Sequence, residues 1–320
     1  MRIFERAYFV KGIFFILNPA SRSGKSGKLF EMLDRFVETE NCGGVGVTEA
    51  PGHAEQLARE AVEQGYRALV SVGGDGTLNE VVNGIMALPA AERPAVGIYS
   101  SGTGGDFFRG LSERHVFPSG LDWLRQRREI PADVGLATFE YGTGKALQKK
   151  YFLNIADAGI SGEVVRRVNA SGKKYGAVEY LIATVASALQ YKAPKVRLRW
   201  RDLMGSESAR EMRLLLAVAA NGPYFGGGMC IAPQALIDDG VFELMMAEKI
   251  SYWTLLTRLP RVYFKQQLRH PKVSYARGAW FCIESLDGDM PLDLDGENLR
   301  ARKVTFELLP RALRVMVPKC

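Results

Sequence analysis

The sequence predicts an N-terminal doubly wound α/β domain followed by a mostly-β second domain. In the first 110 residues, short apolar runs alternate with segments of helical periodicity, which is typical of a parallel sheet with crossover helices. Beyond Pro131, apolar runs of strand length follow one another with few helical segments between them. We therefore place the boundary near residues 128–133, with residues 1–130 as the α/β domain and residues 131–302 as the second domain.

The predicted strands of the first domain each end in a loop of small or polar residues. Helical spacing follows at residues 29–37 and 54–61. Loops at the carboxyl ends of strands are where open α/β sheets usually bind ligands. The predicted strands cover residues 13–17, 45–48, 68–72 and 95–99.

The second domain contains a long series of strand patterns and one long helix, at residues 178–189. A flexible Gly-Thr-Gly-Lys turn separates the first two strands. The predicted strands cover residues 134–141, 151–156, 195–200, 213–219, 241–246, 272–275, 280–284 and 304–308.

Composition excludes several classes of protein. The chain has 320 residues, 47% of them hydrophobic and 24% charged, which suits two globular domains and gives no sign of disorder. The four cysteines lack the spacing of a zinc site or a disulfide framework, so a reducing cytosol fits best. The apolar run at residues 12–17 is too short for a signal peptide or a membrane span, and we expect no transmembrane segment.

The net charge of +7 indicates an anionic partner, without choosing among nucleic acid, anionic lipid and nucleotide. The stretch 249–283 contains no Asp or Glu, and its basic residues alternate with aromatic and leucine side chains. Such a surface can rest on an anionic bilayer. The alternative is a core helix whose basic residues are simply solvated.

The most informative stretch, residues 70–84, predicts a strand, a tight glycine loop and a helix. Gly73, Gly74 and Gly76 would let backbone N–H groups approach an anion, and the helix start adds a positive dipole. Asp75 would repel a phosphate unless a divalent cation lies between them. The alternative is an ordinary loop in which Asp75 or Thr77 caps the helix.

Neither common nucleotide motif is present. In the dinucleotide fingerprint G-x-G-x-x-G counted from Gly73, the last glycine is replaced by Leu78. The Walker pattern around Gly24 needs a glycine five residues earlier, and Pro19 stands there.

Taken together with later motifs, the chain resembles the diacylglycerol kinase catalytic family, in particular its short bacterial lipid kinases, over essentially its whole length. Gly-Gly-Asp-Gly-Thr alone is shared with NAD kinases, and the motifs of the second half separate the two. The motifs are Asn18-Pro19-x-Ser21, Thr48, Gly52-His53-Ala54, residues 73–84, residues 101–106, residues 221–229, Ile231-Ala232-Pro233, Asp238-Asp239-Gly240 and Asp295-Gly296-Glu297.

The resemblance implies that the first domain binds ATP with Mg²⁺ and that the second is a β-sandwich, with residues 303–320 returning to the first domain. It implies an ATP-dependent lipid kinase that phosphorylates a lipid hydroxyl, diacylglycerol giving phosphatidic acid being the first choice. A sphingoid base or another lipid alcohol, an NAD kinase, and a non-catalytic lipid or nucleotide sensor are the alternatives. The positions implied to hold the nucleotide are Asn18, Pro19, Ser21, Thr48, Gly73, Gly74, Asp75, Gly76, Thr77, Asn79, Glu80, Thr103 and Asp106.

The resemblance also assigns chemistry to carboxylates. Glu297 matches the general base, and Asp75 would act through Mg²⁺ on the nucleotide. Asp106 and Asp133 would complete a metal and water network. Without the resemblance, Asp295-Gly296 is simply a hairpin turn.

A second metal site, away from the chemistry, is implied at Asp239 with the backbone carbonyls of Leu236 and Val241. The alternative is a plain turn that caps a strand. Another acidic turn, Asp287-Gly288-Asp289, competes with residues 295–297 but is followed by Met-Pro, unlike the family pattern. Gly105 replaces the family's Asn, which would loosen the nucleotide loop or shift substrate preference.

We expect a cytoplasmic protein, peripherally associated with the inner face of the membrane through anionic phospholipid. The stretch 249–283 is the first candidate surface, and the pairs Arg166-Arg167 and Lys173-Lys174 are the second. No nucleic-acid partner is expected, and a homodimer is possible. His53 can face the nucleotide, but fixing its own loop is the simpler role.

Overall fold

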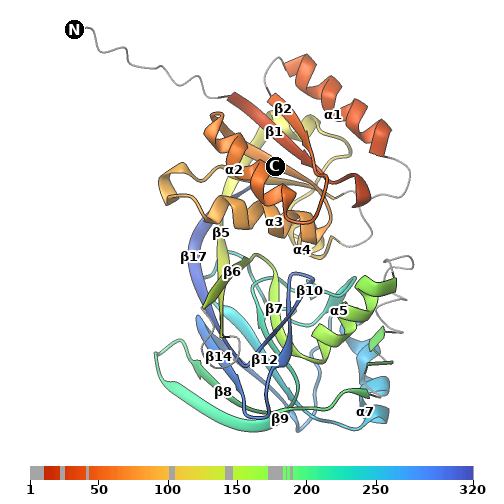
Figure 1. Ribbon diagram of the computed structural model, residues 1–320, viewed down its shortest axis with the longest axis vertical. Helices are drawn as coiled ribbons and strands as arrows, with labels where there is room; N and C mark the ends of the chain where they lie inside the picture. The colour runs from red at the N-terminus through yellow and green to blue at the C-terminus, as the bar shows by residue number, and fades with distance from the viewer. Residues whose placement is uncertain are drawn as a thin grey trace, which may run out of the picture. The chain divides into compact units, whose positions relative to one another are not determined.

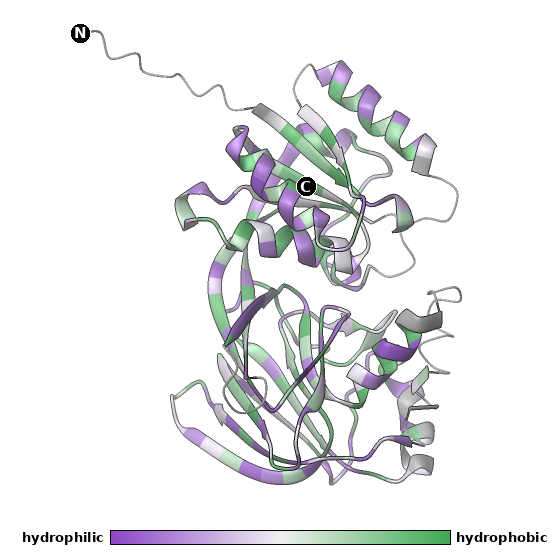
Figure 2. Ribbon diagram, in the orientation of Figure 1, coloured by the Kyte–Doolittle hydropathy of each residue, from purple (hydrophilic) through white to green (hydrophobic). Residues whose placement is uncertain are grey.

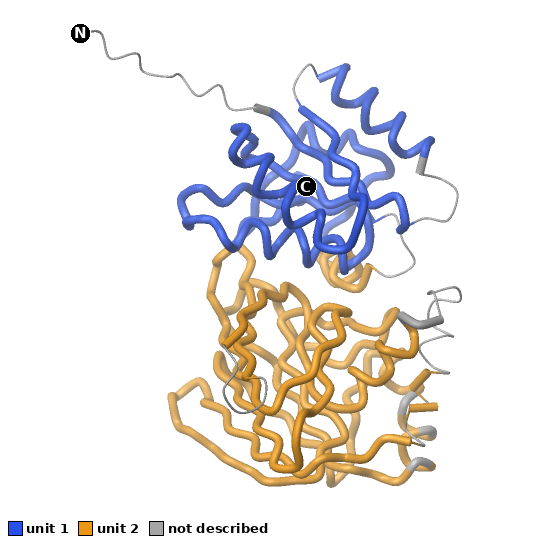
Figure 3. The backbone as a smooth tube through the Cα atoms, viewed as in Figure 1, with its two compact units in different colours: residues 1–102, 115–130, 313–320 blue, residues 103–114, 131–312 orange. Residues whose placement is uncertain are grey.

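The computed structural model describes residues 11–21, 26–40, 43–100, 105–140, 147–171, 183–184, 186–187 and 190–319. The chain divides into two compact units (Figure 3). Unit 1 comprises Met1–Gly102, His115–Ile130 and Leu313–Cys320, and unit 2 comprises Thr103–Arg114 and Pro131–Ala312. The segment 103–114 differs from the predicted division in grouping with the second unit, because its described residues contact the segment 224–265.

Unit 1 has the predicted α/β class. Its strands form a parallel sheet in the order β4-β3-β1-β2 (Figure 1). Phe15, Leu69 and Val70 are fully buried in these strands, and green and purple alternate along α1 in Figure 2, as in a helix with one apolar face. The elements are β1 (Lys11–Leu17), η1 (Pro19–Ser21), α1 (Ser26–Glu40), β2 (Gly43–Val47), α2 (His53–Glu63), β3 (Tyr66–Gly73), α3 (Asp75–Met86), η2 (Ala90–Glu92), β4 (Ala95–Ser100) and η3 (Asp122–Gln126).

The helices α2 and α3 approach each other closely at Gly84. A Cβ atom at this position would lie 2.4 Å from the carbonyl oxygen of Glu55 and 3.0 Å from the Cβ of Ala58. Only glycine permits this approach. The start of α3 is therefore held in place by α2 as well as by β3.

Unit 2 is a sandwich of two sheets. One sheet contains β6, β5, β17, β14 and β8, and the other contains β16, β15, β7, β9, β12 and β13. The long strand β9 belongs to both, because its first half pairs with β8 and its second half pairs with β7 and β12.

Most strand pairings of unit 2 are antiparallel, and β5–β6, β8–β9, β12–β13 and β15–β16 join strands that are consecutive in the chain. β17 begins in unit 2, and its last residues, which belong to unit 1, pair in parallel with β4. The elements are α4 (Asp106–Ser112), β5 (Arg127–Glu140), β6 (Gln148–Phe152), β7 (Ile155–Gly159), α5 (Ile160–Ser171), β8 (Lys195–Arg201), β9 (Glu207–Ala220), β10 (Tyr224–Phe225), β11 (Met229–Cys230), β12 (Phe242–Glu248), α7 (Tyr252–Arg258), η4 (Leu259–Phe264), β13 (Val273–Gly278), β14 (Trp280–Ser285), β15 (Met290–Leu294), β16 (Glu297–Ala301) and β17 (Lys303–Pro318).

Aromatic rings fill the core between the two sheets. Phe152 stacks on Phe242 with ring centroids 5.6 Å apart, and it meets Phe306 edge-on at 5.8 Å. A second apolar cluster, which includes Val164, Val218 and Met245, packs α5 on the other face of the second sheet. Unit 2 thus has the expected β-sandwich with a helical layer added.

Two of the differences from the predictions have a clear physical reason. The helix α5 was missed because its apolar side is rich in valine, whose β-branched side chain favours strands. The predicted strand 151–156 is two strands, β6 and β7, because the backbone N–H groups of residues 153–155 turn toward Asp295. Most of the predicted helix 178–189 lies outside the described residues, although 183–184, 186–187 and 190 are helical. Within the described part of the chain, no helix has the length and apolarity needed to cross a membrane.

Candidate active site

The glycine loop of unit 1 joins the end of β3 to the start of α3. Thr77 folds back over Gly73, where a Cβ atom would lie only 2.5 Å from the Thr77 Oγ1. Asn18, at the end of β1, donates from Nδ2 to the same Oγ1 at 2.9 Å, and its backbone N–H donates to Val72 at 3.0 Å. These contacts fix the loop by joining the carboxyl ends of two parallel strands.

The start of α3 is suited to an anion. Gly74 is the N-cap residue, and Asp75 and Gly76 form the first turn of a 12-residue helix. Asp75 and Gly76 are not buried, whereas Thr77 is only 5% exposed. The first N–H groups of a helix have no partner within it, and they carry the positive end of its dipole. This loop can therefore bind a phosphate group.

Other predicted nucleotide positions have structural partners. Glu80 accepts the backbone N–H of Ala54 at 3.1 Å and so supports the start of α2. Asn79 is 2% exposed and accepts hydrogen bonds from Asn83. His53 accepts the N–H of Glu49 at 3.1 Å through Nδ1, which fits the simpler role of fixing its own loop.

The remaining positions of this group lie near the end of β1. Ser21 donates from Oγ to the carbonyl of Asn18 at 2.8 Å, and Pro19 begins the short helix η1. Thr48 is buried, and its N–H donates to Leu17 at 2.9 Å. Thr103 lies outside the described residues.

In unit 2, the hairpin between β15 and β16 presents Glu297. Asp295 and Gly296 both have positive φ, 49° and 91°, as a tight hairpin turn requires. The Asp295 carboxylate accepts backbone N–H groups from Leu153 at 2.7 Å and from Ile155 at 2.8 Å. The family's Asp-Gly-Glu motif is thus a hairpin turn, and its aspartate anchors the turn to the β6–β7 connection.

Glu297 follows this turn and is partly exposed. The Lys150 ammonium group donates to its Oε2, so the two side chains form an ion pair at the surface of unit 2. A carboxylate held in one orientation on a rigid hairpin can accept a proton from a hydroxyl within hydrogen-bond reach. Sequence reasoning missed Lys150, because no local pattern connects residues 147 positions apart.

Two buried carboxylates lie on the strands next to this hairpin, Asp157 on β7 and Asp293 on β15. They are direct partners in the antiparallel register and are 0% and 7% exposed. Asp293 accepts the Gly296 N–H at 2.8 Å, and the Ser161 hydroxyl donates to Asp157. Burial, together with the charge of Asp293, raises the pKa of Asp157 well above its ordinary value, although the hydrogen bond from Ser161 opposes this.

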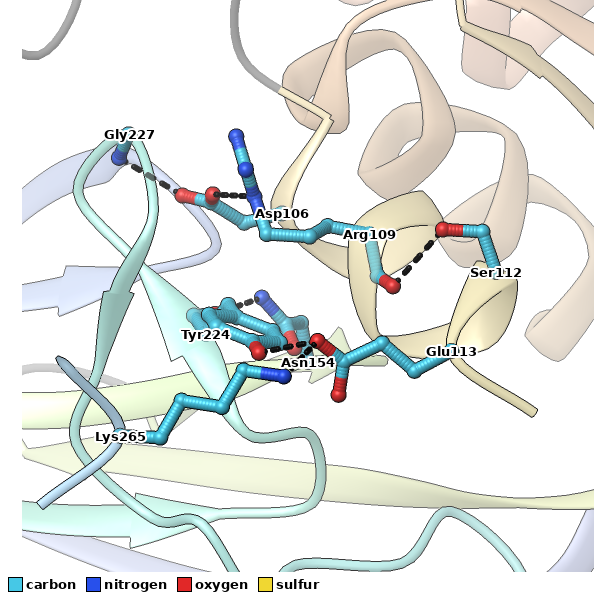
Figure 4. Close-up of polar contacts among 8 residues, drawn as sticks. All are labelled: Asp106, Arg109, Ser112, Glu113, Asn154, Tyr224, Gly227 and Lys265. Carbon is cyan, nitrogen blue, oxygen red and sulfur yellow. Dashed lines mark hydrogen bonds and ion pairs between the residues drawn. The ribbon is translucent and has the colours of Figure 1, made fainter. Parts of the chain in front are cut away.

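A second polar cluster joins the 105–114 segment to the 224–265 segment within unit 2 (Figure 4). Asp106, 4% exposed, accepts the Gly227 N–H at 2.8 Å. Glu113 accepts hydrogen bonds from the Tyr224 hydroxyl and, at 2.7 Å, from Lys265. Burial raises the pKa of Glu113, but these two hydrogen bonds and the charge of Lys265 outweigh it, so the net pKa is lowered.

Tyr224 is the centre of this cluster. Burial and the hydrogen bond to Glu113 raise its pKa to about 12. The Arg109 guanidinium lies 5.8 Å from its ring centroid, and the Lys265 ammonium 6.0 Å. The contacts hold α4 against the turn of residues 225–228, so Asp106 has a positioning role in unit 2.

Asp133 and Asp239 are also committed to hydrogen bonds. Asp133 is fully buried and accepts the N–H groups of Gly240 and Arg311, each at 2.7 Å. Burial raises its pKa, and the nearby Asp239 adds to the shift, while the two N–H groups oppose it. Asp239 accepts the Arg277 guanidinium at 2.8 Å and the Val241 N–H at 3.1 Å.

Comparisons with known proteins agree with this geometry. The diacylglycerol kinase catalytic domain matches residues 12–137, and the YegS C-terminal NAD kinase beta sandwich-like domain matches residues 154–317. A "Probable lipid kinase YegS-like" protein from Chromohalobacter salexigens is 31% identical over 307 residues, covering 93% of this chain and 92% of the relative. The chain belongs to the diacylglycerol kinase family.

Other members and fold relatives extend the match. A diacylglycerol kinase from Staphylococcus aureus is 30% identical, covering 95% of this chain and 91% of that protein. A solved diacylglycerol kinase from Bacillus anthracis has a TM-score of 0.66 at 18% identity and covers 97% of each chain. Yeast NADH kinase, at a TM-score of 0.53 and 10% identity over 97% of this chain and 84% of its own, shares the fold.

Membership of the diacylglycerol kinase family confirms the resemblance seen in the motifs and the predicted fold class, and it makes this protein a kinase. A kinase takes a nucleotide substrate. Within the described residues, no group of three or more His, Cys, Asp or Glu side chains is placed to hold a metal ion. The individual roles of the site residues stay predictions, and we treat them as proposals below.

Proposed function

We propose that this protein is an ATP-dependent lipid kinase that transfers the γ-phosphate of ATP to a hydroxyl group of a membrane lipid. Diacylglycerol is the proposed acceptor, which makes phosphatidic acid the product. The observation that supports this most directly is Glu297, a partly exposed carboxylate on a rigid hairpin, in a chain with the family's Gly-Gly-Asp-Gly-Thr loop.

The glycine loop binds the phosphates in this proposal. Phosphoryl transfer needs positioned phosphates and charge stabilisation, with little covalent work by the protein. The N–H groups around Gly74 and Gly76 are the donors, and the Asn18 to Thr77 hydrogen bond keeps the loop in shape. Bound Mg²⁺ would supply screening of the phosphate charges, and Asp75 is the residue of this loop that would hold it.

Glu297 is the general base. It accepts the proton of the lipid hydroxyl as the hydroxyl oxygen bonds to the γ-phosphorus. The bond between this phosphorus and the β–γ bridging oxygen breaks, and ADP is released. Lys150 holds the carboxylate through Oε2 and is a positioning residue. Asp295 and Asp293 hold the hairpin by accepting the backbone N–H groups of Leu153 and Gly296. The carboxylate of Glu297 is therefore oriented before the substrate binds.

One assay tests the function. The purified protein is incubated with γ-labelled ATP and Mg²⁺ in mixed micelles that contain diacylglycerol, a sphingoid base, or no acceptor, and separately with NAD. We expect label in phosphatidic acid. Label only in the sphingoid base or in NAD would replace the proposed acceptor, and nucleotide binding without transfer to any of them would indicate a sensor.

A metal at Asp239 is a separate proposal. Arg277 already neutralises this carboxylate, and the Val241 N–H donates to it, so a Mg²⁺ ion would have to displace the guanidinium group. If Mg²⁺ binds there, the melting temperature should rise with Mg²⁺ in the wild type and not in Asp239→Ala. An unchanged melting temperature in the wild type would remove this site.

We also propose that α7 and η4 dock on the membrane. Trp253 and Phe264 are each 74% exposed, and Arg261 and Arg269 are exposed basic residues of the same segment. By contrast Val262 is buried, and Leu255, Tyr263 and Leu268 pack against the core of unit 2. The docking surface is therefore narrower than the stretch 249–283.

Ion pairs narrow this surface further. Lys265 pairs with Glu113 at 2.7 Å, Lys272 with Glu248 at 3.4 Å and Arg277 with Asp239 at 2.8 Å. A cation that is already paired with a carboxylate attracts an anionic lipid surface less strongly. The docking cations are then Arg258, Arg261 and Arg269, each worth about 1 kcal/mol near an anionic leaflet.

Vesicle sedimentation tests the docking surface. Replacing both Trp253 and Phe264 with Ala, or Arg258, Arg261 and Arg269 with Gln, should weaken binding to anionic vesicles and leave ATP binding unchanged. Met204→Ala is the control, because Met204 is 89% exposed on the β8–β9 turn. Equal sedimentation of all four proteins at low salt would rule this surface out, and the Arg166-Arg167 region would be tested next.

A further inference from the structure

A cavity of about 490 Å³ lies within unit 2, among α5, the middle of β9 and the turn between β14 and β15. Its volume is in the range of small-molecule binding sites. None of the residues that line it takes part in the kinase function proposed above. Its described basic lining residues are Arg166, Arg167, Lys192, Arg213 and Arg300.

The positive charge around this cavity is incompletely neutralised. Arg166 and Arg300 share one carboxylate, Glu163, at 2.8 and 3.1 Å. Arg167 donates to the amide oxygen of Gln190 at 2.5 Å, and Arg213 donates to the carbonyl of Ala193 at 3.4 Å.

The two other lining carboxylates do not change this balance. Asp287 accepts the backbone N–H of Lys195 at 2.7 Å, and Asp289 is exposed. Among the described lining residues, five cations therefore face three carboxylates. An anion would enter this cavity with a favourable interaction energy.

Several buried polar atoms in the cavity wall have no hydrogen-bond partner among the described residues. They are the Ser187 and Ser285 hydroxyls, the Tyr191 hydroxyl and the Arg167 Nε. Ser187 and Ser285 are only 2% and 1% exposed. Buried polar groups are nearly always hydrogen-bonded, so four such groups around one cavity indicate a missing partner.

The chemistry of these atoms specifies that partner. All four can donate a hydrogen bond, and Arg167 Nε can only donate. A ligand with several acceptor oxygens and negative charge satisfies them, and arginine side chains recognise phosphate oxygens through paired N–H groups. A cation would be repelled by the surplus of positive charge.

We propose that this cavity binds a phosphate monoester. The cavity is larger than a phosphate ion, so it has room for the organic part of the ester. Such a group is carried both by soluble sugar and polyol phosphates and by the headgroup of phosphatidic acid. The arginines bind the phosphate, and Ser187, Ser285 and Tyr191 complete its hydrogen bonds.

Isothermal titration at constant ionic strength tests this inference, with glycerol 3-phosphate as the probe. The double variant Arg167→Gln, Arg213→Gln should bind at least about tenfold more weakly than the wild type, since it loses two charge-assisted contacts. Arg210→Gln is the matched control, because Arg210 is on the same strand, β9, and does not line the cavity. Its affinity for glycerol 3-phosphate should equal that of the wild type.

A second variant separates binding from folding. Ser187→Ala removes a hydroxyl that has no hydrogen-bond partner within the described part of the chain, so stability should be unchanged while affinity for glycerol 3-phosphate falls. ATP affinity, measured in parallel, should be the same in all variants, which excludes a contribution from the glycine loop. The absence of binding in the wild type, or equal binding in the wild type, the double variant and Ser187→Ala, would overturn the proposal.

Vesicles distinguish the two sources of the ester. Phosphatidic acid vesicles are compared with phosphatidylcholine vesicles, using the wild type and the double variant. Loss of phosphatidic acid binding in the double variant assigns the cavity to a lipid headgroup. Retained vesicle binding with lost glycerol 3-phosphate binding assigns it to a soluble ester.

Discussion

The glycine loop at Gly73 and the hairpin at Gly296 both place an acidic residue beside glycine at the end of a strand, but they are built differently. The glycine loop is held by a contact four residues away, from Thr77 to Gly73, and by Asn18 on the adjacent strand. The hairpin is held by Asp295, which binds backbone groups about 140 residues away. One turn is specified mainly by local sequence, and the other by tertiary contacts.

This difference has a functional side. The loop leaves backbone N–H groups available at a helix start, which suits a ligand that arrives with negative charge. The hairpin uses its own aspartate to accept backbone N–H groups and leaves Glu297 as the exposed acid. The glycine loop should therefore control nucleotide affinity, and the hairpin should control the chemical step.

Glu297→Gln should show the largest effect. If Glu297 is the general base, kcat should fall about 10²–10⁴-fold, while the Kd for Mg-ATP stays unchanged, since a base acts mainly in the transition state. Labelled phosphate transfer and nucleotide titration measure the two quantities. Glu307→Gln, an exposed glutamate on β17, is the control. Near-normal turnover of Glu297→Gln would refute the assignment.

Asp295→Ala should cost the most stability. It removes the acceptor of the Leu153 and Ile155 N–H groups from a turn whose φ at residue 295 is 49°. Hydrogen bonds to a charged group contribute about 1.5–3 kcal/mol each, so we expect a loss of about 3–6 kcal/mol in the free energy of unfolding.

Urea denaturation measures this loss. Asp289→Ala in the neighbouring acidic turn is the control, because its side chain is exposed. A change in Asp295→Ala as small as in Asp289→Ala would show that the tertiary contacts do not hold the hairpin.

The glycine loop offers a matched pair of variants. Gly73→Ala would place a Cβ atom 2.5 Å from Thr77 Oγ1, whereas at Gly76 nothing lies within 4 Å of an added Cβ. Displacing Thr77 should break its hydrogen bond with Asn18, so we expect KM for ATP to rise about tenfold in Gly73→Ala. Gly76→Ala should leave the Asn18–Thr77 hydrogen bond intact, so a rise in KM in that variant would report close approach of the phosphates and not distortion of the loop. An unchanged KM in Gly73→Ala would contradict the local account of this loop.

The sequence predicted features that depend on local patterns. The strand–loop–helix at residues 70–84, the class of both halves and the turn-forming pair Asp295-Gly296 follow from periodicity and turn chemistry, whereas the contacts that anchor this turn do not. The family resemblance selected Glu297. It did not show Lys150 or the role of Asp295, because side-chain partners far apart in sequence depend on how the sheets pair.

Buried polar residues were the hardest to predict. Asp157 interrupts the otherwise apolar strand Ile155–Gly159, and that interruption was its only signal. Long-range ion pairs gave no signal either: Lys265 lies in the stretch 249–283 that the sequence offers as a membrane surface, and it pairs with Glu113. The position of Asp157 is decided by packing, since a buried carboxyl group persists only where the fold supplies a hydrogen-bond partner, here Ser161.

The smallest expected effect concerns Asp157, and it tests whether the buried pair supports the hairpin. Asp157 is raised in pKa by burial and by Asp293, so the folded protein keeps a proton there that the unfolded chain releases above about pH 3.9. Its contribution to stability is complete below that value. As the pH rises toward the folded pKa, stability is lost at about 1.4 kcal/mol per pH unit.

Asp157→Asn removes this titration while keeping the size of the side chain. The free energy of unfolding of the wild type, relative to that of Asp157→Asn, should therefore fall between pH 4 and the folded pKa, and the two curves should run parallel above it. Urea denaturation at each pH measures the difference, with Asp202→Asn on an exposed turn as the control. Parallel curves for Asp157→Asn and the wild type over the whole range would mean that Asp157 is ionised in the folded protein. The Gly296 N–H would then be held by Asp293 next to a second negative charge, and the hairpin would owe its rigidity to Asp295 alone.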